Sequence, residues 1–180
     1  MAYYNQLSVM NDVPKQIVRN IITFVEDADG VSSNNDNLFK LLKYNSTDAL
    51  SNSITTKDKI AVLNQNTDLA ENGVIFQRFN DFTFEEKITQ LRIFIQSGNP
   101  INNTLSNIIV GFDIVVHNDL NILDNGDNRS LIILNELLKT LNGMEIGLGI
   151  LDFSIGGGFV LLDFNESFQG YRLTMGTRSN

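Results

Sequence analysis

Few side chains in this chain have the chemistry of a catalytic group, and the first to consider is its only histidine. His117 ends an apolar run and is followed by Asn118 and Asp119. A lone histidine can act as a general base, but there is no serine in a nucleophile-elbow motif and no second histidine to complete a metal site. We therefore expect His117 to have a structural or surface role.

Asp113 is the second candidate, because it interrupts the apolar run from Ile109 to Val116. A carboxylate inside a strand either faces solvent or pairs with a cation. Arg92 or Arg172 on a neighbouring strand would be a suitable partner. Ion pairing is therefore favoured over catalysis for Asp113.

Two glycine-containing motifs resemble ligand sites but lack the residues that such sites need. When Gly126 of the segment Asn121 to Asp127 is aligned with the invariant glycine of a calcium loop, Leu123 takes the third position and Ile132 the place of the bidentate glutamate. Gly156-Gly157-Gly158 lacks the lysine, the Ser or Thr and the helix of a phosphate-binding loop. We expect a turn into a helix at the first motif and a flexible hairpin at the second.

Acidic residues also give no catalytic pattern. Glu85-Glu86-Lys87 and the pair Asp27 and Asp29 raise the question of two-carboxylate hydrolysis, but their spacing defines no cleft, and acids beside caps and turns are ordinary. The sequence therefore predicts no catalytic residue, no metal ligand and no cofactor site. We expect the protein not to be an enzyme.

Composition excludes several other classes. The 180 residues have a net charge of -8, and the 13 lysines and arginines are scattered, which disfavours a groove that binds nucleic-acid phosphates. Cysteine is absent, which removes disulfides and thiolate chemistry. No apolar stretch approaches the ~18 residues of a membrane helix, and no basic segment followed by an apolar run opens the sequence. We expect a soluble protein without a secretion signal or a membrane partner.

The strands are predicted from the period of the apolar residues. Leu91, Ile93 and Ile95 share one face of the segment Gln90 to Gln96. Ile108 to His117 is apolar almost throughout, which suits a central strand buried on both faces. Further strands are expected at Ile150 to Ile155, Phe159 to Phe164 and Gly170 to Met175. An extended segment is also expected at Val74 to Phe79, next to an aromatic patch formed by Phe76, Phe79, Phe82 and Phe84.

The helices are predicted from caps and apolar stripes. A first helix begins at Asn11 or Asp12 and carries a stripe from Ile17 to Val25. After a Ser- and Asn-rich linker, Leu38 to Leu42 form an amphipathic turn or two, and another short helix begins at Thr55 or Thr56. The strongest helix begins at Asn128-Arg129-Ser130 and ends at Gly143, and its predicted buried stripe is Leu131, Leu134, Leu137, Leu138 and Leu141.

These elements predict an α+β fold with a mostly antiparallel sheet covered by helices. We expect one domain over residues 1–180, with an N-terminal helix and a helical and loop insertion at about residues 29–73.

The order of these elements resembles the head-tail connector and tail terminator proteins of tailed bacteriophages. Most of the likeness lies in the order itself, over Pro14 to Met175, and its specific parts are the turn and helix of Gly126 to Leu141 and the ending Phe168-Gln169-Gly170-Tyr171. The Asn- and Ile-rich composition is similar to that of crAss-like phage proteins. Fold resemblance alone is an associational argument for function.

This resemblance implies a tail-terminator-like fold and a structural virion protein. Such a protein forms a ring in the phage neck or tail that joins head to tail and surrounds the DNA path. Its partners would be further copies of itself, in a cyclic homo-oligomer of roughly twelvefold order, and the portal or adjacent neck and tail proteins. DNA would pass through the lumen without specific binding, and the protein would be located in the virion, and in the host cytoplasm during assembly.

The segment Asp29 to Gly73 is longer than a minimal terminator needs, which leaves open whether the ring is a stopper, a terminator or a tail ring. The alternative function is a small non-enzymatic protein-binding or regulatory module. For the ring, the loops Ser97 to Asn107 and Asp119 to Arg129 are the expected interface elements. The candidate interface residues are Arg92, Asn99, Asn103, Asp124, Asp127 and Arg129.

Overall fold

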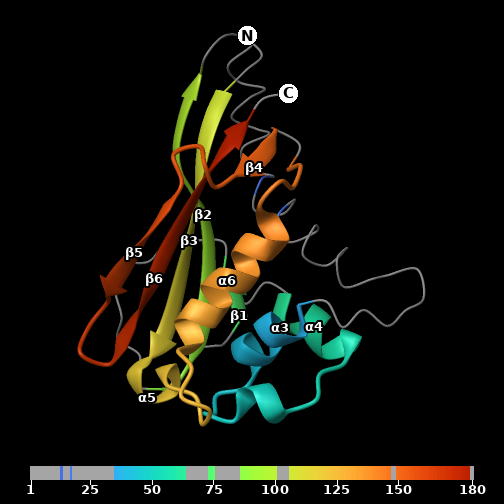
Figure 1. Cartoon of the computed structure of the whole chain (residues 1–180), viewed down its shortest axis with the longest axis vertical. Coiled ribbons are helices and arrows are strands. Elements are labelled where there is room, and N and C mark those ends of the chain that lie inside the picture. Colours follow the sequence, from blue (N-terminus) through green and yellow to red (C-terminus); the bar gives the residue numbers. More distant parts are fainter. Residues whose placement is uncertain are drawn as a thin grey trace.

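The computed structural model describes residues 13, 17, 35–63, 73–75, 86–100, 106–146 and 149–178. Over these residues the chain forms a six-stranded sheet, and helices pack against one of its faces (Figure 1). The predicted α+β class with a mostly antiparallel sheet is therefore confirmed.

Strand order places one long strand, β3, at the centre of the sheet. The order is β1-β2-β3-β6-β4, and β5 pairs with β6 as well. Among the strands of the described residues, only β1 and β2 run parallel, whereas every other pair is antiparallel. The strands are β1 (Gly73–Ile75), β2 (Thr89–Pro100), β3 (Ser106–His117), β4 (Ile150–Asp152), β5 (Gly158–Asp163) and β6 (Phe168–Arg178).

The predicted strand periods are confirmed in β2 and β3. Leu91 and Ile93 are fully buried on the face that carries the helices, and Ile95 is partly buried beside them. Strand β3 has neighbours on both sides and buried residues on both of its faces, because Phe112 and Ile114 lie in the main core and Val115 in a second, smaller one. The apolar run was therefore a correct sign of a central strand.

The expected hairpin around the three glycines is wrong. Strands β4 and β5 do not pair with each other: β4 lies along residues 176–178 of β6 and β5 along residues 169–174. The turn between them therefore carries the chain onward along one edge of β6. Gly157 fits this turn because a Cβ atom there would lie 1.8 Å from the carbonyl oxygen of Phe153.

The expected loop from Ser97 to Asn107 is also shorter than predicted. Pairing of β2 with β3 continues through Gly98 and Asn99 to Pro100, opposite Ser106, after a register shift between Ile95 and Ser97. The polar residues that suggested a loop thus extend a long hairpin instead. Its tip, residues 101–105, lies outside the described part of the chain.

Two short helices begin within the predicted insertion. Helix α3 (Asp36–Lys43) buries Leu38, Phe39, Leu41 and Leu42, as its apolar pattern predicted. Helix α4 (Thr56–Leu63) begins with a capping box, in which the Thr55 amide donates to Asp58 Oδ2 and the Asp58 amide donates to Thr55 Oγ1. A short 3₁₀ helix, η1 (Ala49–Ser51), lies between them.

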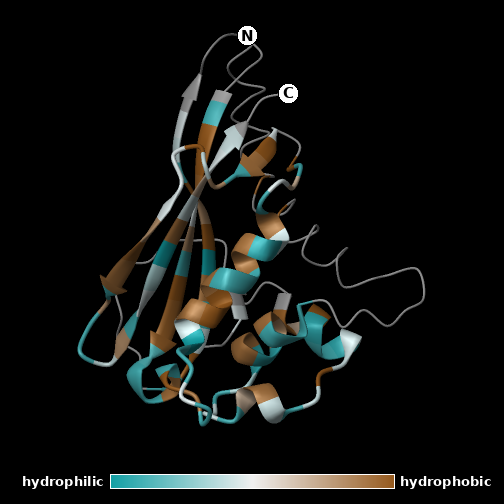
Figure 2. Cartoon of the chain, viewed as in Figure 1, coloured by the Kyte–Doolittle hydropathy of each residue, from teal (hydrophilic) through white to brown (hydrophobic). Residues whose placement is uncertain are grey.

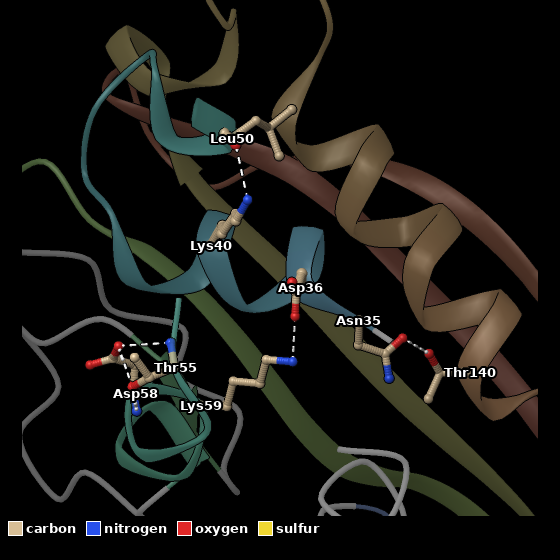
Figure 3. A network of polar contacts seen from close by, with 8 residues as sticks. All are labelled: Asn35, Asp36, Lys40, Leu50, Thr55, Asp58, Lys59 and Thr140. Carbon is tan, nitrogen blue, oxygen red and sulfur yellow. Dashed lines mark hydrogen bonds and ion pairs between the residues drawn. The ribbon is translucent and has the colours of Figure 1, made fainter. Parts of the chain in front are cut away.

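Polar contacts fix α3 to its neighbours (Figure 3). Lys59 of α4 forms an ion pair with Asp36 of α3, and Lys40 Nζ donates to the carbonyl of Leu50 at 3.1 Å. On the other side, Thr140 Oγ1 donates to Asn35 Oδ1 at 2.8 Å. Apolar residues of α3 share one core with the sheet, so this part of the insertion belongs to the main body of the fold.

Helix α6 (Arg129–Leu141) begins where it was predicted, with the Leu131 amide donating to the side chain of its cap Asn128 at 3.0 Å. Its buried stripe is partly different from the prediction. Leu134, Leu137 and Leu141 are buried, but Leu131 is 42% exposed and Leu138 only partly buried, while Ile133 is fully buried. The helix is rotated so that the line from Ile133 to Leu137 and Leu141 faces the sheet. A single turn, α5 (Asn118–Asn121), precedes it.

Several other predictions fall on residues outside the described ranges. Val13 and Ile17 of the predicted first helix are helical and buried in the core. The rest of that helix, most of the linker and the four phenylalanines of the aromatic patch lie outside the description.

Candidate interaction surface

A row of charged residues crosses the centre of the sheet. Arg92 of β2 lies opposite Asp113 of β3, and Asp113 lies opposite Arg172 of β6. Arg172 binds the carboxylate with two hydrogen bonds, from Nε to Oδ1 at 2.6 Å and from Nη2 to Oδ2 at 2.8 Å. The predicted ion pair of Asp113 is therefore confirmed, and Arg172 is its direct partner.

Arg92 completes the row from the other side. Its side chain is fully buried, and Nε and Nη2 donate to Gln90 Oε1 at 3.3 and 2.9 Å. Burial lowers the pKa of Arg92 to about 10, and the nearby charge of Asp113 opposes that change. The hydrogen bond with Asp113 raises the pKa of Arg172, against a smaller effect of its burial. Both arginines are therefore cations at neutral pH, and they flank one carboxylate.

An aromatic ring packs beside this row. The Phe94 ring lies over Gly111, where a Cβ atom would be 2.5 Å from the ring, and the Arg172 guanidinium carbon is 5.3 Å from the ring centroid. Cross-strand contacts of this kind stabilise neighbouring strands. The row therefore fixes β2, β3 and β6 to one another and has the form of a structural element.

The edge strand β5 has the opposite character, since its apolar side chains are in solvent. Phe159 is 58% exposed, and Val160 and Leu161 are each 54% exposed. Phe159 and Leu161 lie opposite Leu173 and Tyr171, on the face that carries the helices, whereas Val160 lies opposite Arg172 on the other face. Figure 2 shows β5 as a strongly apolar ribbon at the side of the molecule.

The position of the helices explains this exposure. Helix α6 lies against β3 and β6, and α3 lies against β2. The flank of α6 that carries Arg129 and Thr140 is bonded to the α3 region, so the helical layer extends from α6 away from β5. In Figure 1 strand β5 accordingly lies outside this layer.

An exposed apolar edge strand is unusual in a free monomer. Natural edge strands are protected by charges, prolines or bulges, because open backbone groups beside apolar side chains promote pairing with other chains. From Gly158 to Leu162, β5 has no charged residue and no proline. We therefore take Phe159, Val160 and Leu161, called the β5 edge below, as the candidate interaction surface.

The structure places two of the predicted interface residues inside the subunit. Arg92 and Arg129 are fully buried, so neither offers surface to a neighbouring subunit, and for these two the expectation is wrong. Arg129 Nη1 donates to the carbonyls of Leu41 and Tyr44 at 3.0 and 2.9 Å, and Nη2 donates to that of Ser46. Burial lowers its pKa to about 10.

The other predicted interface residues keep that role as a prediction. Asp124 and Asp127 are exposed in the turn before α6, where Asn125 Nδ2 donates to Asp127 Oδ2 at 2.7 Å. Asn99 is paired in register with Asn107, and Asn103 lies outside the described residues. Gly126 has a φ of 86°, so the segment is a glycine turn into a helix, as predicted.

His117 acts as the cap of α5. Its Nδ1 accepts a hydrogen bond from the Asp119 amide at 3.2 Å, and its ring meets the edge of Phe168 at 5.1 Å between centroids. These contacts give the histidine the structural role that was expected. In the described part of the chain, no group of three or more His, Cys, Asp or Glu residues is placed to hold a metal ion.

The β5 edge was missed by the sequence reasoning. A continuous apolar run such as Phe159 to Leu162 is typical of a strand buried on both faces. Only the strand order shows that this run lies at an edge. The signal in the sequence that could have indicated an edge strand is the short length of the apolar run, which begins after three glycines and ends before Asp163.

The fold and this surface define a small α+β protein whose most prominent exposed apolar strand, within the described residues, is β5. The chain belongs to the YomW family, which matches residues 35–177. This is a protein family of the Bacillus phage SPbeta region, and the chain is accordingly a bacteriophage-related protein. No curated protein and no solved structure gave a significant match. Among the described helices, none has the length and apolar character needed to cross a membrane.

Proposed function

We propose that the protein is a structural subunit of a phage virion and closes into a homo-oligomeric ring in the neck or tail. The ring would join head to tail and surround the DNA path. The observation that carries this proposal is the β5 edge, whose apolar side chains are more than half exposed. Membership of a phage-related family supports it.

Association explains the β5 edge better than a monomeric function does. A strand with open backbone groups and apolar side chains on both faces gains free energy when another chain covers it. A cyclic oligomer satisfies every such edge by repeating one pair of different patches around the axis. The number of copies is expected to be roughly twelve, to match a portal.

The polar groups of the described residues support a non-enzymatic role. Asp113 is held by Arg172, and His117 caps a helix through Nδ1. A catalytic base must reach a proton of the substrate, and these two groups are occupied by structural contacts. We propose that the protein needs no cofactor and catalyses no reaction.

The net charge of -8 fits a passage for DNA. An acidic lumen lets a duplex slide without attracting its phosphates, and repulsion is screened beyond about 8 Å at physiological salt. In this proposal the partners are further copies of the chain and the adjacent portal, neck or tail proteins. The protein is located in the virion, after assembly in the host cytoplasm.

Purified phage particles provide the decisive test. Mass spectrometry of the particles should detect the protein, and cryo-electron microscopy should show density of this fold repeated around the axis of the neck or tail. A protein that is missing from the particles, or is present there without a symmetry axis, would contradict the proposal.

The same β5 edge also suits a second function, a small binding or regulatory module. Extended peptides add to open sheet edges through backbone hydrogen bonds, with side-chain contacts for specificity. In that case the protein would be found in infected cells bound to another protein and would be absent from particles. The particle experiment therefore separates the two functions.

A further inference from the structure

We infer that the β5 edge is the joint between neighbouring subunits, and that it pairs antiparallel with the opposite edge of the sheet, strand β1, in a second copy. This inference rests on the proposed ring and names the surfaces that would close it. It commits to another copy of the same chain as the occupant of the β5 edge.

An added strand is the occupant that covers the exposed apolar side chains of the β5 edge on both faces of the sheet. Phe159 and Leu161 lie on one face of the sheet and Val160 lies on the other, and all three are more than half exposed. A helix packed on one face would leave the other face in solvent. A strand added at the edge places side chains on both faces and also pairs the open backbone groups of β5.

The net charge of the chain is the reason to infer that a second copy occupies the β5 edge. Each chain has a net charge of -8, so most surfaces of two copies repel each other. The run from Gly158 to Leu162 has no charge, and Asp163 lies at its end. Two acidic copies can therefore meet along this run without like charges facing each other.

Strand directions favour β1 as the partner. Strand β1 runs parallel to β2, and β5 runs antiparallel to β6, which has the same direction as β2. When a neighbouring copy is placed beside β5 in the same orientation, its β1 therefore runs antiparallel to β5. Antiparallel pairing is the slightly more stable kind. Because β1 is parallel to β2, the two end strands of the sheet run in opposite directions, and copies in one orientation can pair them antiparallel.

The two ends of the sheet are different patches, as a cyclic contact requires. Strand β5 lies at one end, and β1 at the other, where its only sheet partner among the described residues is β2. A head-to-tail contact between different patches closes a ring when the rotations between successive copies add up to a full turn, whereas a contact between identical patches stops at a dimer. With every copy in the same orientation, the helices also stay on one side of the extended sheet.

The absence of cysteine permits a direct test by disulfide trapping in the full-length chain. Position 74 is in register with Leu91, on the helix face, and position 75 is in register with Arg92, on the other face. Positions 159 and 161 belong to the helix-face register of β5. Disulfides form only when Cβ atoms are about 3.5–4.5 Å apart, so they report register closely.

Under mild oxidation, Val74→Cys should give a ladder of covalent oligomers with one of the two partners, Phe159→Cys or Leu161→Cys, and the partner that reacts reports the register. Ile75→Cys combined with Leu161→Cys is the matched control, because its two positions belong to opposite faces, and it should give no ladder. Single-cysteine variants should stay monomeric on a denaturing gel. Covalent dimers of Leu161→Cys alone would show that two β5 edges pair with each other and would overturn the inference.

A charge at the edge gives an independent readout. Leu161→Lys should abolish rings seen by native mass spectrometry and electron microscopy, with the melting temperature of the subunit unchanged. Leu131→Lys, at an exposed apolar position of α6, should leave the rings intact. Rings that survive Leu161→Lys, with no ladder from the cysteine pairs, would overturn the β5 joint but leave the ring function standing. Ladders without a closed ring would instead contradict the ring and support the joint.

Discussion

The centre of the sheet and its β5 edge reverse the usual distribution of side chains. At the centre, Arg92 and Asp113 are charged and buried. At the edge, Phe159 and Val160 are apolar and more than half exposed. The buried charges at the centre are explained by their partners, since Asp113 is bonded to Arg172. Within the described subunit, nothing explains the exposed apolar side chains at the edge.

This difference separates stability from association. Buried charges are tolerated only when they are paired, so the central row indicates a part of the fold that must stay intact. Exposed apolar residues on an edge strand contribute little to the folded subunit and gain from a partner. We therefore expect substitutions at the centre to unfold the protein and substitutions at the edge to change only its assembly.

The largest effect is expected for Asp113→Ala. This change leaves Arg172 without its carboxylate partner and removes a nearby negative charge from the buried Arg92, and breaking a buried pair in this way destabilises by roughly 3–5 kcal/mol. Urea denaturation followed by circular dichroism would measure the loss. The double variant Asp113→Leu with Arg172→Met should recover part of it. A neutral Asp113→Ala would show that the row does not hold the sheet together.

Leu137→Ala should follow with a loss of about 2–5 kcal/mol, because Leu137 is fully buried between α6 and the sheet. Leu131→Ala on the same helix is the matched control and should change the unfolding free energy by less than about 0.5 kcal/mol, since that side chain is 42% exposed. Equal losses from both would mean that the helix is rotated toward the predicted stripe.

His117→Ala should have a smaller effect, about 1 kcal/mol, from loss of the cap that accepts from the Asp119 amide. Ring assembly should be unchanged, because the histidine packs within its own subunit against Phe168. Thermal melts and electron microscopy of the variant would test both statements. A stable variant that no longer assembles would place His117 in a functional site.

Leu161→Ala is expected to change the unfolding free energy by less than about 0.5 kcal/mol, because the side chain is 54% exposed in the subunit. It should nevertheless weaken assembly, measured as the subunit concentration at which half of the protein is in rings. A large loss of stability would show that the edge is part of the core and would remove the contrast drawn above.

No effect at all is expected when duplex DNA is added to the purified protein. The net charge of -8 and the scattered cations offer no site for phosphates, even at ~50 mM salt, where electrostatic binding is strongest. A gel-shift titration tests this. Salt-sensitive micromolar binding would count against the acidic lumen and favour a nucleic-acid-binding role.

Much of the fold was predictable because local rules determine it. The alternation of Leu91 and Ile93, the continuous run of β3 and the cap at Asn128 each follow from the chemistry of neighbouring residues. The ion pair of Asp113 was also predictable, since a carboxylate in a central strand needs a partner.

Features that depend on long-range pairing were not predictable. A run such as Phe159 to Leu162 is the same in the sequence whether its strand lies at the centre of a sheet or at the edge. The burial of Arg129 depends on carbonyls more than 80 residues away in the chain. The helix stripe of α6 was misplaced because Ile133 and Leu131 are equally apolar, and only packing chooses between them.

The hydrogen bonds of Arg129 also affect local unfolding of the protein. Its guanidinium, in the first turn of α6, donates hydrogen bonds to the carbonyls of Leu41, Tyr44 and Ser46, at and just after the end of α3. Because the arginine is buried, separating these two segments would break several hydrogen bonds at once. The end of α3 and the start of α6 should therefore unfold as one cooperative unit. In hydrogen exchange, the amides of these two distant segments would lose protection together, at the same concentration of denaturant.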